Sequence, residues 1–175
     1  MMNETVLRQL MPLLLAEESH VNMMSLRWQE PANDGWTKIS SIVDSGCVEH
    51  VSPPELARNV QTTPSEGSRL GRKYTVASGD DLPNLGQKTV NVVTEDGKSA
   101  MFTTQIADVA KPLTSVGEIC DKGNLVIFSA TGGAIYNLNS RDVIPFTRRN
   151  RNYELTYYVN DGGQQPIQGF QRQGK

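Results

Sequence analysis

Short strand-like segments separated by turn residues run through most of the chain, and they limit the folds that this sequence can adopt. Each segment is rich in β-branched or aromatic residues and is bounded by Gly, Pro, Asn, Asp or Ser. The segments lie at residues 36–43, 72–77, 88–94, 100–107, 125–128, 134–136 and 153–159. Strands this short and this closely spaced predict a small closed or sandwiched all-β domain.

The sequence on either side of these strands divides the chain into three parts. Apolar residues recur at helical spacing near the N-terminus, so residues 1–34 are expected to form a helical or linker segment. Residues 35–159 form the predicted domain, which contains one short helix at 116–121. The Gly- and Gln-rich residues 160–175 are expected to be a disordered polar tail.

Composition excludes several classes of partner. The net charge of −2 gives no electrostatic basis for direct binding to nucleic acid. No apolar run approaches the about 20 residues that would span a bilayer, so no membrane contact is expected. Cys47 and Cys120 are too few for a disulfide framework and fit a reducing compartment. We therefore expect an intracellular, cytoplasmic protein.

The strand at 36–43 leads directly into a single acid, Asp44, which is followed by Ser45 and Gly46. A carboxylate at the end of an apolar strand is costly to bury unless hydrogen bonds or a second acid share its charge. Aspartic peptidases need a carboxylate in this position, on a loop that a hydroxyl residue braces. The same triplet is also ordinary turn chemistry, so the spacing alone leaves both interpretations open.

Two further stretches follow the Asp44 triplet in order, a turn-rich segment at 78–86 and the longer segment from Lys111 to Phe128. The longer segment reads KPLTSVGEICDKGNLVIF. It resembles the stretch LLSV-x-x-L-C-D-K-G-x-x-V-x-F of retropepsins in copia-type retrotransposons, which follows an Asp-Ser-Gly loop at a similar distance. The resemblance extends over residues 36–159 and is more specific than the triplet alone.

The resemblance implies a retropepsin fold, a small closed β-barrel with one short helix and a hairpin flap. It implies a catalytic loop formed by Asp44, Ser45 and Gly46. It implies a supporting loop formed by Leu113, Thr114 and Ser115. It also implies a flap that closes over the substrate, formed by Ser78, Gly79, Asp80, Asp81 and Leu82.

The same resemblance implies a homodimer, because the chain has a single Asp-Ser-Gly triplet whereas pepsin-like enzymes have two in a longer chain. Two Asp44 side chains about 3 Å apart would share one proton and activate a water molecule, as the aspartic-protease dyad does. The implied activity is that of an aspartic endopeptidase that cuts peptides or a retroelement polyprotein. No cofactor is expected.

Thr114 and Cys47 depart from the usual retropepsin pattern. Thr114 adds a hydroxyl that needs a hydrogen-bond partner if it is buried, and Cys47 lies where alanine is more usual. These departures leave open a catalytically inactive module that keeps the fold and binds peptides or dimerises. An unrelated β-barrel in which Asp44 caps a turn is a third alternative.

Two other patterns carry weaker signals. Cys47 and His50 have a C-x-x-H spacing that Cys120 and His20 could extend to a zinc set, but no second close pair exists, so no metal site is predicted. The basic run Arg148-Arg149-Asn150-Arg151 is interpreted as a solvated turn rather than a nucleic-acid patch.

Overall fold

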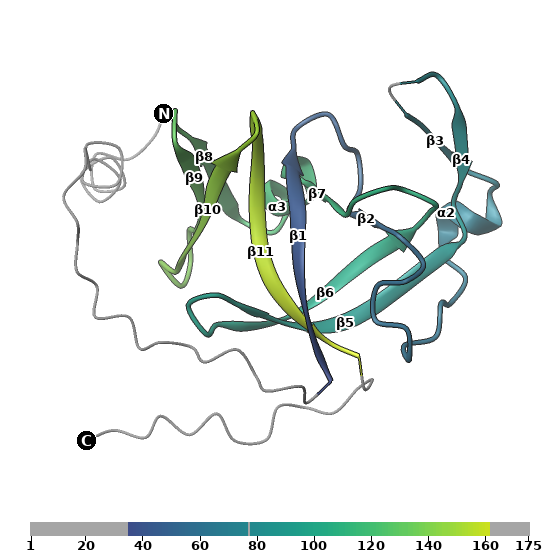
Figure 1. Cartoon of the computed structure of the whole chain (residues 1–175), viewed down its shortest axis with the longest axis horizontal. Coiled ribbons are helices and arrows are strands. Elements are labelled where there is room, and N and C mark those ends of the chain that lie inside the picture. The colour runs from purple at the N-terminus through teal and green to yellow at the C-terminus, as the bar shows by residue number, and fades with distance from the viewer. Residues whose placement is uncertain (1–34, 77, 162–175) are drawn as a thin grey trace.

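The computed structural model describes residues 35–76 and 78–161, and these residues form an all-β domain (Figure 1). The prediction of an all-β fold is confirmed. The expected helical or linker segment at 1–34 lies outside the described residues, as does the expected tail from residue 162 onward. The last strand runs to Asn160, one residue beyond the expected end of the domain.

Eleven strands and two short helices follow one another along the described part of the chain. The strands are β1 (Trp36–Asp44), β2 (Val51–Ser52), β3 (Lys73–Thr75), β4 (Asp81–Pro83), β5 (Gly86–Thr94), β6 (Ser99–Ile106), β7 (Leu113–Ser115), β8 (Asn124–Phe128), β9 (Gly132–Asn137), β10 (Val143–Arg149) and β11 (Asn152–Asn160). The helices are α2 (Glu66–Arg69) and α3 (Val116–Asp121).

Nine strands form one sheet in the order β1-β7-β2-β6-β5-β11-β10-β9-β8, while β3 and β4 form a separate two-stranded sheet. β1 also pairs with β11, so the series of paired strands from β1 through β7, β2, β6, β5 and β11 returns to β1. β11 connects these parts because it pairs with β1, β5 and β10 at different points along its length (Figure 1). β1 is therefore held along most of its length before it reaches Asp44.

The hydrophobic core is built largely from β5 and β11. Alternate residues of a strand point to the same face, and on these two strands that face carries Val90, Val92, Leu155, Tyr157 and Val159, all buried. Burying one large apolar side chain contributes roughly 1.5–3 kcal/mol, so this face is the main source of stability. β11 also pairs with β1, which links the core to the candidate site.

The sequence predicts a loop at residues 61–67, but α2 begins within it. Ser65 caps this helix because its hydroxyl accepts the Ser68 N–H at 3.1 Å, while the Ser68 hydroxyl accepts the Ser65 N–H at 2.9 Å. The prediction of a single short helix is therefore wrong for the described residues. Gly67 weakens the helical pattern, which explains why the sequence alone indicates a loop.

β10 is the longest strand that the sequence pattern does not predict. Pro145 interrupts the apolar pattern in its middle, and two arginines at its end give it the polarity of a turn. Arg148 and Arg149 belong to the strand, and only Asn150 and Arg151 form the turn, with φ angles of 49° and 68°. The basic run is thus a strand end with a tight turn, which corrects its interpretation as a turn throughout.

Candidate active site

Asp44 is the last residue of β1, and β7 lies beside it. The two strands run parallel, with Val43 opposite Thr114 and Asp44 opposite Ser115. The Ile42 N–H also donates to the Pro112 carbonyl at 2.9 Å. The predicted catalytic loop and the predicted supporting segment are thus neighbours, although the supporting segment is a strand rather than a loop.

The backbone after Asp44 turns so that the Gly46 N–H donates to Asp44 Oδ1 at 2.7 Å. This bond fixes the orientation of the carboxylate while leaving its other oxygen free of this contact. A Cβ at Gly46 would lie 3.3 Å from the same oxygen, so a side chain would crowd it. Asp44 is half-buried, whereas Ser45 and Gly46 are exposed. The carboxylate is therefore both held in place and accessible.

Ser115 holds the loop that follows Asp44 against β7 and α3. It is fully buried, and its hydroxyl donates to the Cys47 carbonyl at 2.7 Å. The same hydroxyl accepts the Glu118 N–H at 3.2 Å and so caps α3. One side chain thus joins the end of β7, the start of α3 and the loop that follows Asp44.

His50 is a second buried anchor of this loop, and the sequence gives only its spacing from Cys47. Its Nδ1 accepts the Ser115 N–H at 3.0 Å, and its own backbone N–H donates to Glu118 Oε2 at 2.6 Å. Burial lowers the pKa of His50 to about 4, and the Lys122 cation acts in the same direction. The Glu118 carboxylate, 3.4 Å from Nε2, opposes this shift without overcoming it. His50 is a neutral structural acceptor at pH 7.

Both residues that depart from the retropepsin pattern are accommodated. The buried Thr114 hydroxyl is 2.6 Å from the buried Ser41 hydroxyl, so it has the partner that it needs. The Cys47 thiol donates to the Glu49 carbonyl at 2.7 Å, and burial raises its pKa to about 11. A thiol with this pKa is a poor nucleophile at neutral pH, which argues against a Cys47–His50 catalytic pair.

The predicted flap residues lie on a hairpin formed by β3 and β4. Lys73 is opposite Pro83 and Thr75 is opposite Asp81, and the described residues 76 and 78–80 lie at the tip. The tip makes contacts within itself, since the Ser78 hydroxyl donates to Asp80 Oδ2 at 2.6 Å. The tip is shorter than the one predicted at 78–86, because β4 (Asp81–Pro83) and the start of β5 occupy part of that segment.

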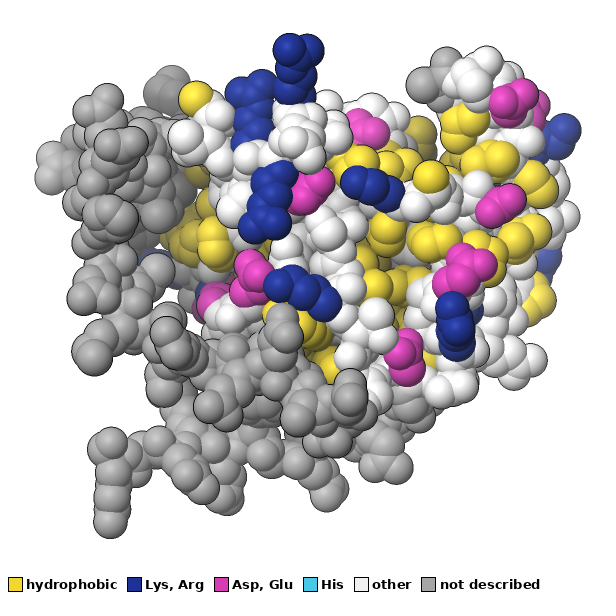
Figure 2. Space-filling model, viewed as in Figure 1, with side chains coloured by type: hydrophobic (Ala, Val, Ile, Leu, Met, Phe, Trp, Pro, Cys, Tyr) yellow, Lys and Arg dark blue, Asp and Glu magenta, His cyan; other side chains and the backbone are white. Residues whose placement is uncertain are grey.

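This hairpin projects from the domain on the same side as the end of β1 (Figure 1). Its residues Tyr74 and Leu82 share one face and pack, together with Cys47, against Val51, Ala107 and Val109. Hydrophobic side chains appear at the surface between the hairpin and the strand ends (Figure 2). Val48, which lies in the loop after Asp44, is 80 % exposed and adds an apolar side chain close to the carboxylate.

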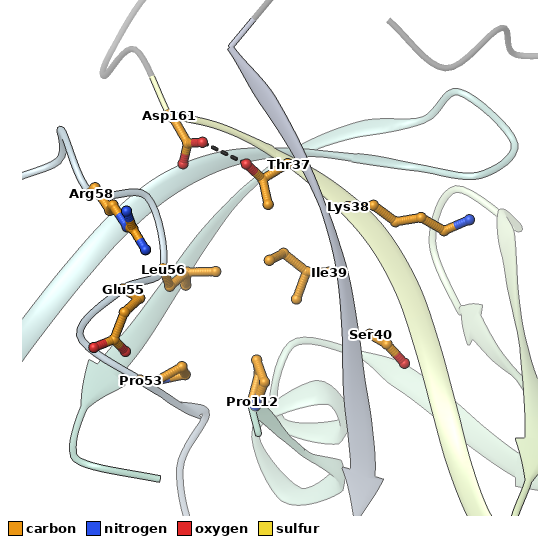
Figure 3. A pocket seen from close by; sticks show the side chains of 10 residues that line it. All are labelled: Thr37, Lys38, Ile39, Ser40, Pro53, Glu55, Leu56, Arg58, Pro112 and Asp161. Atoms are coloured by element: carbon orange, nitrogen blue, oxygen red, sulfur yellow. Dashed lines mark hydrogen bonds between the residues drawn. The ribbon is translucent and has the colours of Figure 1, made fainter. Parts of the chain in front are cut away.

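A groove of about 460 Å³ lies near the start of β1, away from Asp44 (Figure 3). Ile39, Leu56 and Pro112 line it with apolar side chains, and Arg58 and Glu55 lie at its side. None of the predicted site residues lines this groove. The candidate active site lies elsewhere on the surface, at the Asp44 loop and the hairpin.

Within the described ranges, no three His, Cys, Asp or Glu side chains are grouped as metal ligands. His20, one of the residues considered for zinc, lies outside them. No helix in the part of the chain that the structure covers has the length and apolar character needed to cross a membrane.

Comparison of the chain with models of protein families, with curated proteins and with solved structures gives no match in any of the three. The functional assignment therefore depends on the geometry of the site and on the sequence resemblance described above.

Proposed function

We propose that the protein is a retropepsin-type aspartic endopeptidase that acts as a homodimer. The observation that carries the proposal is the position of Asp44 at the end of β1, opposite Ser115 of β7, with its Oδ1 bound by the Gly46 N–H. If Asp44 only capped a turn, the parallel pairing of β1 with β7 and the buried Ser115 would not be needed. The circuit of paired strands that returns to β1 supports the barrel that this fold requires.

The exposed Ser45, Gly46 and Val48 place the acid at the surface, where a second copy can reach it. Two Asp44 carboxylates about 3 Å apart cannot both ionise, so the pair holds one proton. The ionised member takes a proton from a bridging water, which attacks the carbonyl carbon of the peptide bond. The protonated member donates a hydrogen bond to the carbonyl oxygen and stabilises the tetrahedral intermediate.

The β3–β4 hairpin has the place and the shape of a flap that covers an extended peptide. Such a peptide would pair with backbone groups of the hairpin as an added strand. The exposed Val48 in the loop after Asp44 would contact apolar side chains of such a peptide. A polyprotein of a copia-type retroelement is the substrate that the sequence resemblance favours.

The alternative of an inactive module was motivated by Thr114 and Cys47. Neither residue disturbs the loop, because the Thr114 hydroxyl has a partner in Ser41 and the Cys47 thiol has one in the Glu49 carbonyl. We therefore favour catalysis over a binding role, and the following test separates the two.

The test is cleavage of a mixed peptide library between pH 4 and pH 7 by the wild type and by Asp44→Asn. Asp121→Asn serves as the matched control, because Asp121 is an exposed acid at the end of α3. We expect cleavage by the wild type and by the control, and none by Asp44→Asn. Sedimentation at tens of micromolar protein is expected to show a dimer. A folded wild type that is dimeric but cleaves nothing would establish the inactive module instead.

A further inference from the structure

The loop that follows Asp44 is joined to the base of the hairpin by one carboxylate, Glu49. Arg72 Nη1 donates to Glu49 Oε1 at 2.8 Å, and the Tyr74 hydroxyl donates to Glu49 Oε2 at 2.8 Å. Arg72 immediately precedes β3, and Tyr74 lies within it. Both carboxylate oxygens of Glu49 are thus used, and both donors lie at the start of the hairpin.

Asn84 ties the second strand of the hairpin to the same group. Its Nδ2 donates to the Tyr74 hydroxyl at 2.9 Å and to Gln105 Oε1 at 2.9 Å. Its backbone N–H donates to the Arg72 carbonyl at 2.9 Å. Glu49, Arg72, Tyr74 and Asn84, which we call the Glu49 cluster, therefore connect both ends of the hairpin to the Asp44 loop and, through Gln105, to β6.

The cluster is arranged so that each donor has an acceptor. Burial, and after it the hydrogen bond to Glu49, raises the pKa of the Tyr74 phenol well above its usual value, so the hydroxyl keeps the proton that it donates. The Glu49 side chain is 20 % exposed, which weakens the competition of water for its oxygens. The hairpin tip, by contrast, makes hydrogen bonds with its own residues, as described for Ser78 and Asp80. The base is thus the point at which the position of the hairpin is set.

We propose that Glu49 is a positioning residue that fixes the β3–β4 hairpin relative to the Asp44 loop. The flap and the catalytic acid then bind the substrate together. This role rests on the proposed peptidase function. Glu49 does not touch the reacting atoms. It acts through Arg72 and Tyr74, which fix the hairpin, and through its own backbone, which belongs to the Asp44 loop.

Glu49 affects substrate binding because it sets the fraction of molecules in which the hairpin is in place. If loss of the cluster lets the hairpin leave its position, substrate binds only the fraction in which it is seated, and the apparent affinity falls by that fraction. A hydrogen bond to a charged group has a strength that corresponds to about a tenfold change. We therefore expect Glu49→Gln to raise KM by up to about tenfold, with kcat changed much less.

The experiment compares Glu49→Gln and Tyr74→Phe with Glu55→Gln, a matched control at an exposed glutamate in the loop after β2. The first readout is amide hydrogen exchange of residues 73–83 in the full chain, which does not depend on activity. We expect exchange there to become about tenfold faster in both cluster variants, with β5 and β6 unchanged and with the control like the wild type. The second readout is the separate change in KM and kcat for a cleaved peptide.

Unchanged exchange in residues 73–83 of Glu49→Gln would overturn the proposal, as would faster exchange spread evenly over the whole domain. A fall in kcat at constant KM would also overturn it, because that result would place Glu49 in the chemical step. If the wild type cleaves no peptide but exchange at the hairpin responds as expected, the peptidase function fails while the structural link through Glu49 is supported.

Discussion

Acidification is expected to destabilise the protein through His50, because the folded state holds this imidazole in its neutral form. Nδ1 accepts the Ser115 N–H at 3.0 Å, so a proton placed on Nδ1 would face a donor instead of an acceptor. The ring is also buried against Phe102, with ring centroids 4.7 Å apart. The Lys122 cation disfavours the imidazolium, whereas the Glu118 carboxylate, 3.4 Å from Nε2, favours it.

The size of the effect follows from the two pKa values. The pKa of His50 is lowered from 6.5, its value in an unfolded chain, to about 4 in the folded protein. The unfolded state therefore takes up a proton before the folded state does, and the free energy of unfolding falls as the pH decreases from 6.5 towards 4. One pKa unit corresponds to about 1.4 kcal/mol, so the full loss is about 3 kcal/mol. The contribution is fully present above pH 6.5.

Urea unfolding at intervals between pH 7.5 and pH 4 measures this loss. His50→Asn is the control, because an asparagine Oδ1 can accept the Ser115 N–H in place of Nδ1 but does not titrate. We expect the wild type to lose about 3 kcal/mol more than His50→Asn over this range, since carboxylate titration is common to both. Parallel pH profiles for the two proteins would refute the argument that His50 is held neutral.

Two further predictions concern side chains that the structure buries. At pH 8, the Cys120 thiol is expected to react rapidly with a disulfide reagent, because it is exposed. The Cys47 thiol is expected to react slowly, because burial raises its pKa to about 11. Rapid reaction of both thiols would contradict the placement of Cys47. Lys88→Met is expected to reduce the free energy of unfolding by about 2 kcal/mol, because the Lys88 ammonium donates to three carbonyls in the turn at 54–57. Lys111→Met, at an exposed lysine, is its control in urea unfolding, and equal losses in both variants would contradict the buried role.

Local sequence patterns predict those elements whose stability is local. The helix α3 is correctly predicted at 116–121, where Ser115 supplies a cap and Gly123 follows its end. The strand β1 is also predicted almost to its last residue, because β-branched residues recur along it up to Val43. The short helix α2 is missed because its capping depends on two serines rather than on the more familiar Ser and Glu pair.

The candidate site is predictable only in part, for the same reason. The Asp44 triplet and its supporting segment are visible because each is a short continuous motif. The buried state of His50 is not visible, since its acceptor role depends on Ser115 from a distant strand. Likewise, the contact of Glu49 with Arg72 and Tyr74 joins residues that are separated by a helix and a loop. Such pairings are set by the sheet as a whole and leave no periodic signal.

The pairing of β1 with β11 has a consequence for how the protein is made. β1 lies opposite residues 154–160, the last strand of the described domain, so its principal neighbour is synthesised long after it. During translation, the edge of β1 stays unpaired until β11 has left the ribosome, and contacts of such high sequence separation form slowly. The strand that leads to Asp44 therefore gains its longest pairing only when most of the described domain has been synthesised. Topology alone therefore delays completion of the sheet around β1 until residues 154–160 have been synthesised.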